Sequence, residues 1–203
     1  LVGNVENQNL HSLSGYELVI LSHPDFIPEA KRLAEIHEMH DGINAVVVTP
    51  EQIYNEYSSG TPDATAIRLF MRQMYERNGK SDTYLLLMGD GSFDNRAILR
   101  SASTTINNYI LTYQGGSSYD ESATFTSDDY YGMLSPTAFQ SGKVCNGNID
   151  IGVGRLPVTT LEEAKVMVDK IETYLKGGKY GKWRNKVCLV ADDNEVSSAY
   201  NKF

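Results

Sequence analysis

The sequence has few of the residues that build metal clusters, disulfide scaffolds or membrane spans. Only two of its 203 residues are cysteine, which is too few for a disulfide framework or a zinc cluster. No histidine follows His40, so the rest of the chain has no imidazole to act as a base or a metal ligand. No run of about 18 apolar residues occurs, which argues against a membrane-spanning helix.

Clustered positive charge is also missing. The chain has 18 Lys and Arg against 26 Asp and Glu, and its net charge is −8. Because phosphate binding needs a concentrated Lys/Arg surface, this balance argues against a nucleic-acid partner. The nearest approach to a basic patch, Lys176–Lys186, is expected to be a solvated connector. Hydrophobic residues at 41% and charged residues at 22% are typical of a globular domain.

The two cysteines lie in different contexts. Cys188 lies in the apolar run Val187–Ala191 and is predicted to be a buried strand residue. Cys145 lies in the loop Gly142–Asn148, where no base is near in the sequence to activate its thiol. The serines lack the G-x-S-x-G pattern of a nucleophile elbow. No catalytic residue is therefore assigned from the sequence.

Short apolar runs alternate with helical patterns along the chain. Strands are predicted at Tyr16–Ser22, Ile43–Thr49, Thr83–Met88, Ile149–Val153 and Trp183–Ala191. Helices are predicted at Pro24–Asp41, Pro50–Tyr57 and Ala64–Arg77, after Thr159 or Thr160 as far as Lys176, and from near Glu195. Continuous apolar strands separated by helices indicate parallel βαβ units, with right-handed crossovers and helices on both faces of the sheet.

The regular pattern is lost between Gly89 and Ile149, where Gly, Ser, Asn, Thr, Tyr and Asp dominate. A loop-rich segment of this length in a compact domain is more often functional than idle. It is expected to hold a short hairpin, for example around Tyr109–Tyr113 and Tyr130–Leu134.

Acidic residues gather where a parallel sheet would bind a ligand, which is beyond the carboxyl ends of its strands. Asp90 and Asp94 follow one predicted strand, Asp192 and Asp193 follow another, and Asp128 and Asp129 lie in the long loop. Their carboxylates suit a hard cation, which binds oxygen ligands. They equally suit a structural role, in which they cap helices and tie loops through backbone N–H groups.

Two further patterns point to no ligand. The Gly89-Asp90-Gly91 turn is not the glycine fingerprint of a dinucleotide site, because that motif leads directly into a helix. His37 and His40 are three residues apart on a predicted helix, but without an HExxH motif they are expected to be a surface pair.

Longer motifs together resemble the gingipain family of cysteine peptidases. They are the strand that ends at Gly89-Asp90, then TSDDYYG (126–132), IGVGRLPVTTLEEAKVMVDKIETY (151–174) and KWRNKVCLVADD (182–193). The segments QNLHSL, HPDF and MGDGSFDNR are most similar to the PorU-like branch, the sortase of the type IX secretion system. The likeness covers nearly the whole chain.

The resemblance implies an α/β, three-layer caspase-like domain with a mostly parallel sheet flanked by helices. Residues 1–14 are expected to be a linker, 15–182 the first subdomain of the peptidase and 183–203 the start of the second, catalytic subdomain. The family's catalytic His lies in a later Gly-His-Gly context and its Cys lies beyond that, and neither motif occurs here. The chain, which starts at Leu1 without Met, is therefore expected to be a non-catalytic scaffold cut from a longer protein.

For the parent protein, the resemblance implies an exported peptidase at the outer-membrane surface or outside the cell, which removes C-terminal sorting domains from secreted cargo. Its partners would be peptide substrates and the missing second subdomain, and calcium is the one cofactor suggested. Arg155 is expected to pair with an acid such as Asp90 or Asp129, and Gly89 and Gly154 are expected to be structural. Exposed apolar surface on the isolated chain would favour self-association.

Two other functions fit the same residues. A non-enzymatic cell-surface α/β module would use the long loop to bind a protein partner or calcium. A metal-dependent hydrolase would use the acidic clusters, and it would lose activity on Asp90→Asn.

Overall fold

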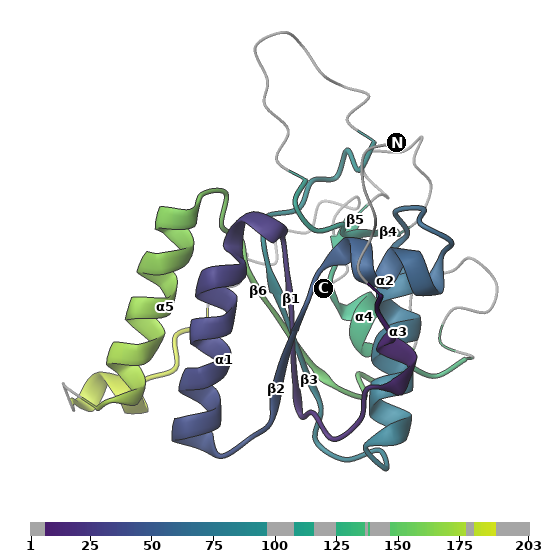
Figure 1. Cartoon of the computed structure of the whole chain (residues 1–203). Helices are drawn as coiled ribbons and strands as arrows, with labels where there is room; N and C mark the ends of the chain where they lie inside the picture. Colours follow the sequence, from purple (N-terminus) through teal and green to yellow (C-terminus); the bar gives the residue numbers. More distant parts are fainter. Residues whose placement is uncertain are drawn as a thin grey trace, which may run out of the picture.

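The computed structural model describes residues 7–96, 108–115, 125–136, 138, 147–177 and 181–189. These residues form three layers, in which a parallel sheet lies between two groups of helices (Figure 1). The predicted α/β architecture is therefore confirmed. No helix in the described ranges is both long and apolar enough to cross a membrane.

The main sheet of the described part has four strands in the order β2-β1-β3-β6, and every neighbouring pair is parallel. The strands are β1 (Leu18–Ser22), β2 (Ala45–Val48), β3 (Tyr84–Met88) and β6 (Gly152–Leu156). In the register, Ile20 of β1 lies opposite Val47 of β2 and Leu86 of β3. Parallel order brings the carboxyl ends of all these strands to one edge.

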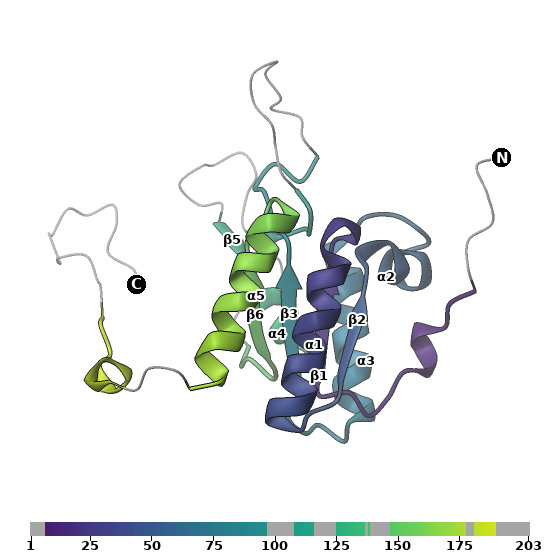
Figure 2. The ribbon, with the colours of Figure 1, turned by 60° about the vertical axis from the view of Figure 1, so that its left-hand side comes forward.

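Helices cover both faces of this sheet. On one face, α1 (Ile27–Asp41) and α5 (Leu161–Leu175) lie side by side (Figures 1 and 2). On the other face lie α2 (Pro50–Tyr57), α3 (Ala64–Arg77) and the short α4 (Asp129–Gly132) (Figure 1). The connections between the strands thus place helices on both faces of the sheet, as the sequence predicted.

Each face has its own apolar core because successive strand residues point to opposite sides. Ile20 packs with Phe26 and Leu33 under α1 and α5. Leu21 packs with Phe70 under α2 and α3. These side chains are almost fully buried, and each contributes roughly 1.5–3 kcal/mol of transfer free energy.

Helix ends follow local sequence signals. Gly42 ends α1 with a left-handed φ of 68°, which glycine adopts without strain. Asp63 caps α3 by accepting the Thr65 N–H, and Thr160 and Glu163 form a reciprocal capping box at the start of α5. The helix predicted from Pro24 begins as the 3₁₀ turn η2 (Pro24–Phe26), and α1 follows it.

The expected linker at residues 1–14 is partly attached to the domain. Its residues 7–14 are described, and they contain the 3₁₀ turn η1 (Leu10–Ser12). Leu10 is buried in the core cluster of α2 and α3. Its N–H and that of His11 donate to the carboxylate of Glu56, at 2.8 and 3.1 Å. The end of the segment is therefore held by both packing and charge-assisted hydrogen bonds.

The predicted strand Trp183–Ala191 is wrong over the residues that the structure describes. Residues 182–185 form the 3₁₀ turn η3 (Lys182–Asn185), and 186–189 belong to no strand. Val187 and Leu189 are 87% and 90% exposed, and Cys188 is exposed rather than buried. An apolar run becomes a strand only where a neighbouring strand and a covering layer receive it, and no described residue buries this one. Cys145, Asp192, Asp193 and the helix predicted near Glu195 lie outside the described residues.

The hairpin of the long loop forms at other residues than predicted. β4 (Tyr113–Gly115) pairs antiparallel with β5 (Phe125–Ser127). The predicted second strand, Tyr130–Leu134, instead contributes to α4, where Tyr131 is fully buried. The strand propensity of these aromatic residues is overridden because packing against α3 buries their rings.

The strand predicted at Ile149–Val153 is displaced toward the carboxyl end and forms β6 (Gly152–Leu156). Asp150 precedes the strand because its N–H donates to the Gly132 carbonyl at 2.8 Å and its side chain accepts the Leu134 N–H. These contacts bind the segment to α4 before the ladder with β3 begins. As a consequence, Arg155 lies inside the strand and not after it.

Candidate functional site

The candidate site lies at the carboxyl edge of the sheet, where the loops after β3 and β6 meet the long loop. Arg155 enters it from β6, opposite Leu87 in the register with β3. Its side chain is 12% exposed. A guanidinium this well covered is stable only where its donors are paired.

All five N–H groups of Arg155 have acceptors. Nε and Nη2 donate to Oδ2 and Oδ1 of Asp128, both at 2.7 Å. Nη1 donates to the carbonyls of Gly89 at 2.8 Å and Ile110 at 3.2 Å, and Nη2 also reaches the Leu111 carbonyl at 3.3 Å. One side chain thus joins the end of β3 to two separate sections of the long loop.

Backbone contacts of Asp90 reinforce this junction. Its carbonyl accepts the N–H groups of Tyr109 at 2.9 Å and Ile110 at 3.1 Å, and its own N–H donates to the Val158 carbonyl at 3.0 Å. Its carboxylate accepts the Gly91 N–H at 2.9 Å. Asp90 therefore ties a turn, as one of the two roles expected for it requires.

Arg155 binds a different acid from the two that the sequence predicted. The expected partners were Asp90 and Asp129, but the acid that binds its guanidinium is Asp128. Asp129 is exposed and begins α4, where its N–H donates to Ser127 Oγ at 3.2 Å. The two adjacent carboxylates face different surroundings because Asp128 precedes α4 and Asp129 begins it, and sequence spacing cannot distinguish them.

The four candidate metal ligands are not gathered into one site. Asp128 is engaged by Arg155, Asp90 binds its own turn, and Asp129 points to solvent. Asp94 is 9% exposed in the loop after β3, where its N–H donates to Ser92 Oγ at 3.1 Å. Across the described ranges, no group of three or more His, Cys, Asp or Glu is placed to hold a metal ion.

Gly89 and Gly154 differ in what they require. Gly89 has a φ of +148°, and a Cβ there would lie 2.9 Å from the Cβ of Tyr109. A side chain at this position would force apart the contact between β3 and the long loop. At Gly154 the nearest atom to an added Cβ is Cδ1 of Leu86 at 3.7 Å, an ordinary contact distance.

Sequence reasoning missed two tyrosines that support the site. The hydroxyl of Tyr131 donates to the Leu111 carbonyl, and burial raises the pKa of this phenol well above its usual range. The hydroxyl of Tyr109 donates to the Thr159 carbonyl at 2.8 Å, and its ring lies 5.2 Å from that of Phe26. The abundance of tyrosine in the long loop was the available signal, because a buried phenol needs an acceptor.

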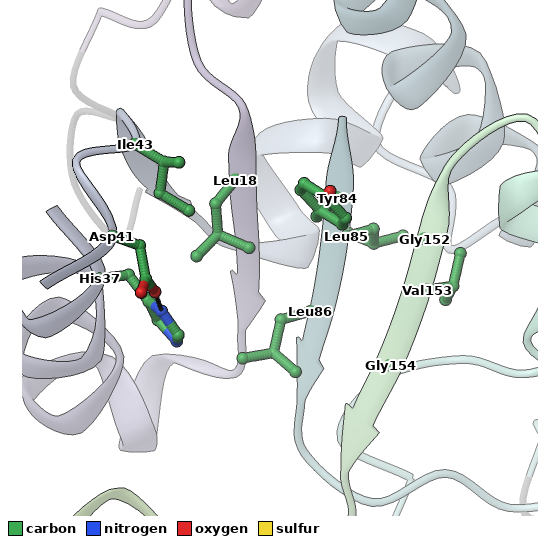
Figure 3. Close-up of a pocket in the computed structure, with 10 residues that line it drawn as sticks. All are labelled: Leu18, His37, Asp41, Ile43, Tyr84, Leu85, Leu86, Gly152, Val153 and Gly154. Atoms are coloured by element: carbon green, nitrogen blue, oxygen red, sulfur yellow. Dashed lines mark hydrogen bonds and ion pairs between the residues drawn. The ribbon is translucent and has the colours of Figure 1, made fainter. Parts of the chain in front are cut away.

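Two hollows border the sheet at opposite ends. One, of about 680 Å³, lies at the carboxyl edge among loops and is lined by residues that include Asp63, Phe93 and Asp94. The other is a groove of about 530 Å³ at the amino ends of β1, β3 and β6 (Figure 3). On β6 it is lined by Gly152, Val153 and Gly154, and His37 and Asp41 of α1 form one wall.

The described histidines contact polar groups and not a thiol. His11 and His23 contact groups on nearby residues, and Nδ1 of His37 and of His40 each lie 2.6 Å from an oxygen of Asp41. The pair is therefore held by a carboxylate and does not face a shared ligand position.

Cys188 is an exposed free thiol. In the part of the chain that the structure describes, no cysteine is paired with a histidine in the way that nucleophilic catalysis requires.

Comparison with solved structures finds matches in fold. The chain resembles dimeric latent PorU from Porphyromonas gingivalis, with 35% sequence identity, a TM-score of 0.78 and coverage of 92% of this chain and 18% of that chain. Two weaker matches have 20% identity and a TM-score of 0.47. They are the complex of the pro- and mature domains of Porphyromonas gingivalis RgpB, and the Arg-specific cysteine proteinase gingipain R. This chain covers 29% of each, and they cover 78% and 81% of it.

The curated proteins contain no match to this chain. The family model of peptidase family C25 matches residues 11–202, which is nearly the whole sequence. This match and the likeness to PorU confirm the resemblance inferred from the motifs, together with the three-layer caspase-like fold. The chain therefore belongs to peptidase family C25, the gingipain family of cysteine peptidases.

Proposed function

We propose that this chain is the non-catalytic scaffold subdomain of an exported cysteine peptidase of the sortase type. The parent would remove C-terminal sorting domains from secreted cargo at the outer-membrane surface or outside the cell. The 35% identity with PorU over 92% of this chain supports this assignment. Because the chain spans only 18% of the PorU chain, the proposal places the reacting groups in sequence beyond these residues.

The scaffold role rests on how the carboxyl edge uses its polar groups. Every N–H of Arg155 binds a backbone carbonyl or Asp128. An arginine committed in this way positions loops and has no donor left for a substrate. In the parent, a histidine-activated thiolate from the second subdomain would attack the peptide carbonyl, and this chain would hold the loops beside it.

The proposed partner surface is the β6 side of the sheet. In the described part, β6 pairs only with β3, so its outer edge is open. Ile149, just before β6, and Val166, on α5, are 54% and 56% exposed. Residues 15–182 would form the first subdomain and 183–203 the start of the second, which would pack on this side. In the isolated chain the same surface favours self-association.

Activity of the chain alone tests the scaffold role. The purified chain is incubated with unstructured peptides, with and without a reducing agent, and a cysteine peptidase such as papain serves as the positive control. We expect no turnover under either condition. Robust cleavage by this chain would refute the proposal, because it would require a nucleophile and a base among these residues.

A longer polypeptide that includes the following region tests the parent's activity. It should cleave a cargo protein that has a C-terminal sorting domain, should leave the same cargo without that domain intact, and should lose activity on thiol alkylation. Cys188→Ser in this longer protein should retain cleavage. Loss of activity in Cys188→Ser, with folding unchanged by circular dichroism, would place the chemistry in this chain and contradict the scaffold assignment.

A further inference from the structure

Three polar side chains meet at the end of α1, outside the carboxyl-edge site. Asp41 lies between two imidazoles, with Oδ2 at 2.6 Å from Nδ1 of His37 and Oδ1 at 2.6 Å from Nδ1 of His40. His37 and Asp41 border the groove at the amino ends of the strands (Figure 3). The other ring nitrogen of His40, Nε2, lies 3.1 Å from the carbonyl oxygen of Leu175.

The two neighbours of His40 are both hydrogen-bond acceptors, and each contacts a different ring nitrogen. A backbone carbonyl can only accept, so the contact with Leu175 requires a proton on Nε2. The carboxylate of Asp41 is also an acceptor, so the second contact requires a proton on Nδ1. A neutral imidazole has one N–H, whereas the imidazolium has two. Only the charged ring therefore makes both hydrogen bonds.

The proton belongs to His40 and not to Asp41. Hydrogen bonds from His37 and from His40 hold the pKa of the Asp41 carboxyl below its usual value, so it stays ionised. The hydrogen bond to Asp41 is also the main reason that the pKa of His40 lies above its usual 6.5. The contacts of the ring and the charge beside it thus favour the same protonation state.

Other charged groups near this corner are engaged elsewhere. On α5, Glu172 pairs with Lys176 and with Arg32 of α1. On α1 itself, Glu38 accepts the Ala45 N–H at 3.3 Å. Just before β1, Glu17 accepts the Asn44 N–H at 2.6 Å. Arg184, which follows α5, donates to the neighbouring Tyr174 carbonyl at 3.4 Å. His40 contacts the Leu175 carbonyl itself, at the helix end where a positive charge is stabilising.

We propose that His40 is a protonation-dependent clamp, whose imidazolium joins Asp41 at the end of α1 to the Leu175 carbonyl at the end of α5. When the ring is neutral it keeps one hydrogen bond and releases the other. The chain leaves α5 directly after Leu175 and continues toward the exposed residues 186–189. The clamp therefore controls how firmly the carboxyl end of α5 is held to the end of α1. It concerns only contacts within this chain and does not depend on the proposed peptidase function.

The sign of the pH dependence follows from the raised pKa of His40. A group whose pKa is higher in the folded chain stabilises the fold fully below its unfolded value, here near 6.5, and loses that contribution as the pH rises through the folded pKa. The clamp is thus closed below pH 6.5 and opens as the pH rises through the raised pKa of His40.

Nuclear magnetic resonance of the full chain tests the clamp directly. In protein labelled with ¹³C and ¹⁵N, both ring nitrogens of His40 are followed with pH, together with the carbonyl carbon of Leu175. We expect the imidazolium at pH 6.5, a titration midpoint above that value, and a shift of the Leu175 carbonyl with the same midpoint. A ring that is neutral at pH 6.5, or a Leu175 carbonyl that does not follow the ring, overturns the proposal.

Two variants sharpen the result. Asp41→Asn removes the carboxylate that holds the proton, so both midpoints should move together to lower pH. His11→Gln changes a distant histidine that contacts Gln73, and it should leave both midpoints unchanged. If Asp41→Asn shifts the ring midpoint but not that of the Leu175 carbonyl, the two contacts are independent and the clamp is refuted. The titration of the unmodified chain remains decisive if Asp41→Asn folds poorly.

Discussion

Arg155 and Asp128 meet fork to fork, with two N–H···O contacts of 2.7 Å between groups 27 residues apart in the sequence. The side chain of Arg155 is 12% exposed and that of Asp128 27% exposed, so water screens the pair only partly. The remaining donors bind carbonyls at the end of β3 and in the long loop. This one arginine therefore joins the regular sheet to the segment whose sequence shows least regularity.

Replacing Arg155 with lysine should destabilise the chain by about 2–4 kcal/mol, because an ammonium cannot reproduce the planar fork and leaves carbonyls and Asp128 without donors. Equilibrium unfolding in urea measures the change. Arg72→Lys is the control, since Arg72 makes a surface i,i+4 pair with Glu76, and its loss should cost less than about 1 kcal/mol. Equal stability of Arg155→Lys and the unmodified chain would show that the fork does not hold the loop.

Two glycines near the site should respond differently to alanine. Gly89→Ala should cost about 1–3 kcal/mol, because the residue has a φ of +148° and its new Cβ would lie 2.9 Å from that of Tyr109. Gly154→Ala should change the free energy of unfolding by less than about 1 kcal/mol, because its Cβ meets only Leu86 Cδ1 at 3.7 Å. Thermal melting of both variants checks this. The same loss in both would mean that the close approach at Gly89 is not what requires glycine.

The capping box at the start of α5 should be measurable on its own. The hydroxyl of Thr160 accepts the Glu163 N–H at 3.2 Å, so Thr160→Ala should lower the free energy of unfolding by about 1 kcal/mol. Thr160→Ser keeps the hydroxyl and should restore most of the loss. Urea unfolding followed by circular dichroism compares the three proteins. If serine and alanine behave alike, the cap contributes little and packing alone fixes the helix start.

Acid should detach the segment around Leu10 from α2. Burial alone raises the pKa of Glu56, but hydrogen bonds from Leu10, Gln8 and His11 outweigh it, and the pKa lies below its usual 4.5. The stabilisation is therefore fully present above 4.5 and is lost as the pH falls through the lower folded pKa.

Hydrogen exchange at the Leu10 amide measures this release. Its protection should fall in acid in the unmodified chain. Glu56→Gln should already show weak protection near neutral pH and should lose the acid dependence. Glu76→Gln changes an exposed carboxylate and should behave like the unmodified chain. Protection that is independent of pH in the unmodified chain would show that packing of Leu10 holds the segment without the carboxylate.

Local sequence signals were sufficient to predict an element where the residues at its two ends mark its start and its stop. The helices at Pro50–Tyr57 and Ala64–Arg77 appear as predicted, because a cap residue, an apolar stripe and a helix stop occur together at each. The same logic was too weak at β6, where Asp150 is bound to α4 and the strand begins later than its apolar run. It was wrong at Trp183–Ala191, because strand formation needs a neighbour that the apolar pattern does not name.

The sequence predicted that an arginine would anchor the long loop, but it did not predict which groups the arginine binds. An arginine expected just after the predicted strand Ile149–Val153, with several acids in the long loop, indicated an anchoring role, and Arg155 does bind an acid of that loop. Which acid it binds depends on the turn at the start of α4, so Asp128 and Asp129 could not be separated in advance. The carbonyls of Gly89 and Ile110 are backbone acceptors, and no residue type in the sequence marks them.

The sequence by itself determined the family and the parallel α/β architecture, because periodicity, helix caps and motif order are properties of residues that are neighbours along the chain. It also showed that no histidine follows His40. Only the tertiary structure decided that Arg155 binds Asp128 and that the ring of His40 contacts the end of α5. Those choices depend on distances between segments that folding brings together, and a donor selects its acceptor by position and direction rather than by residue type.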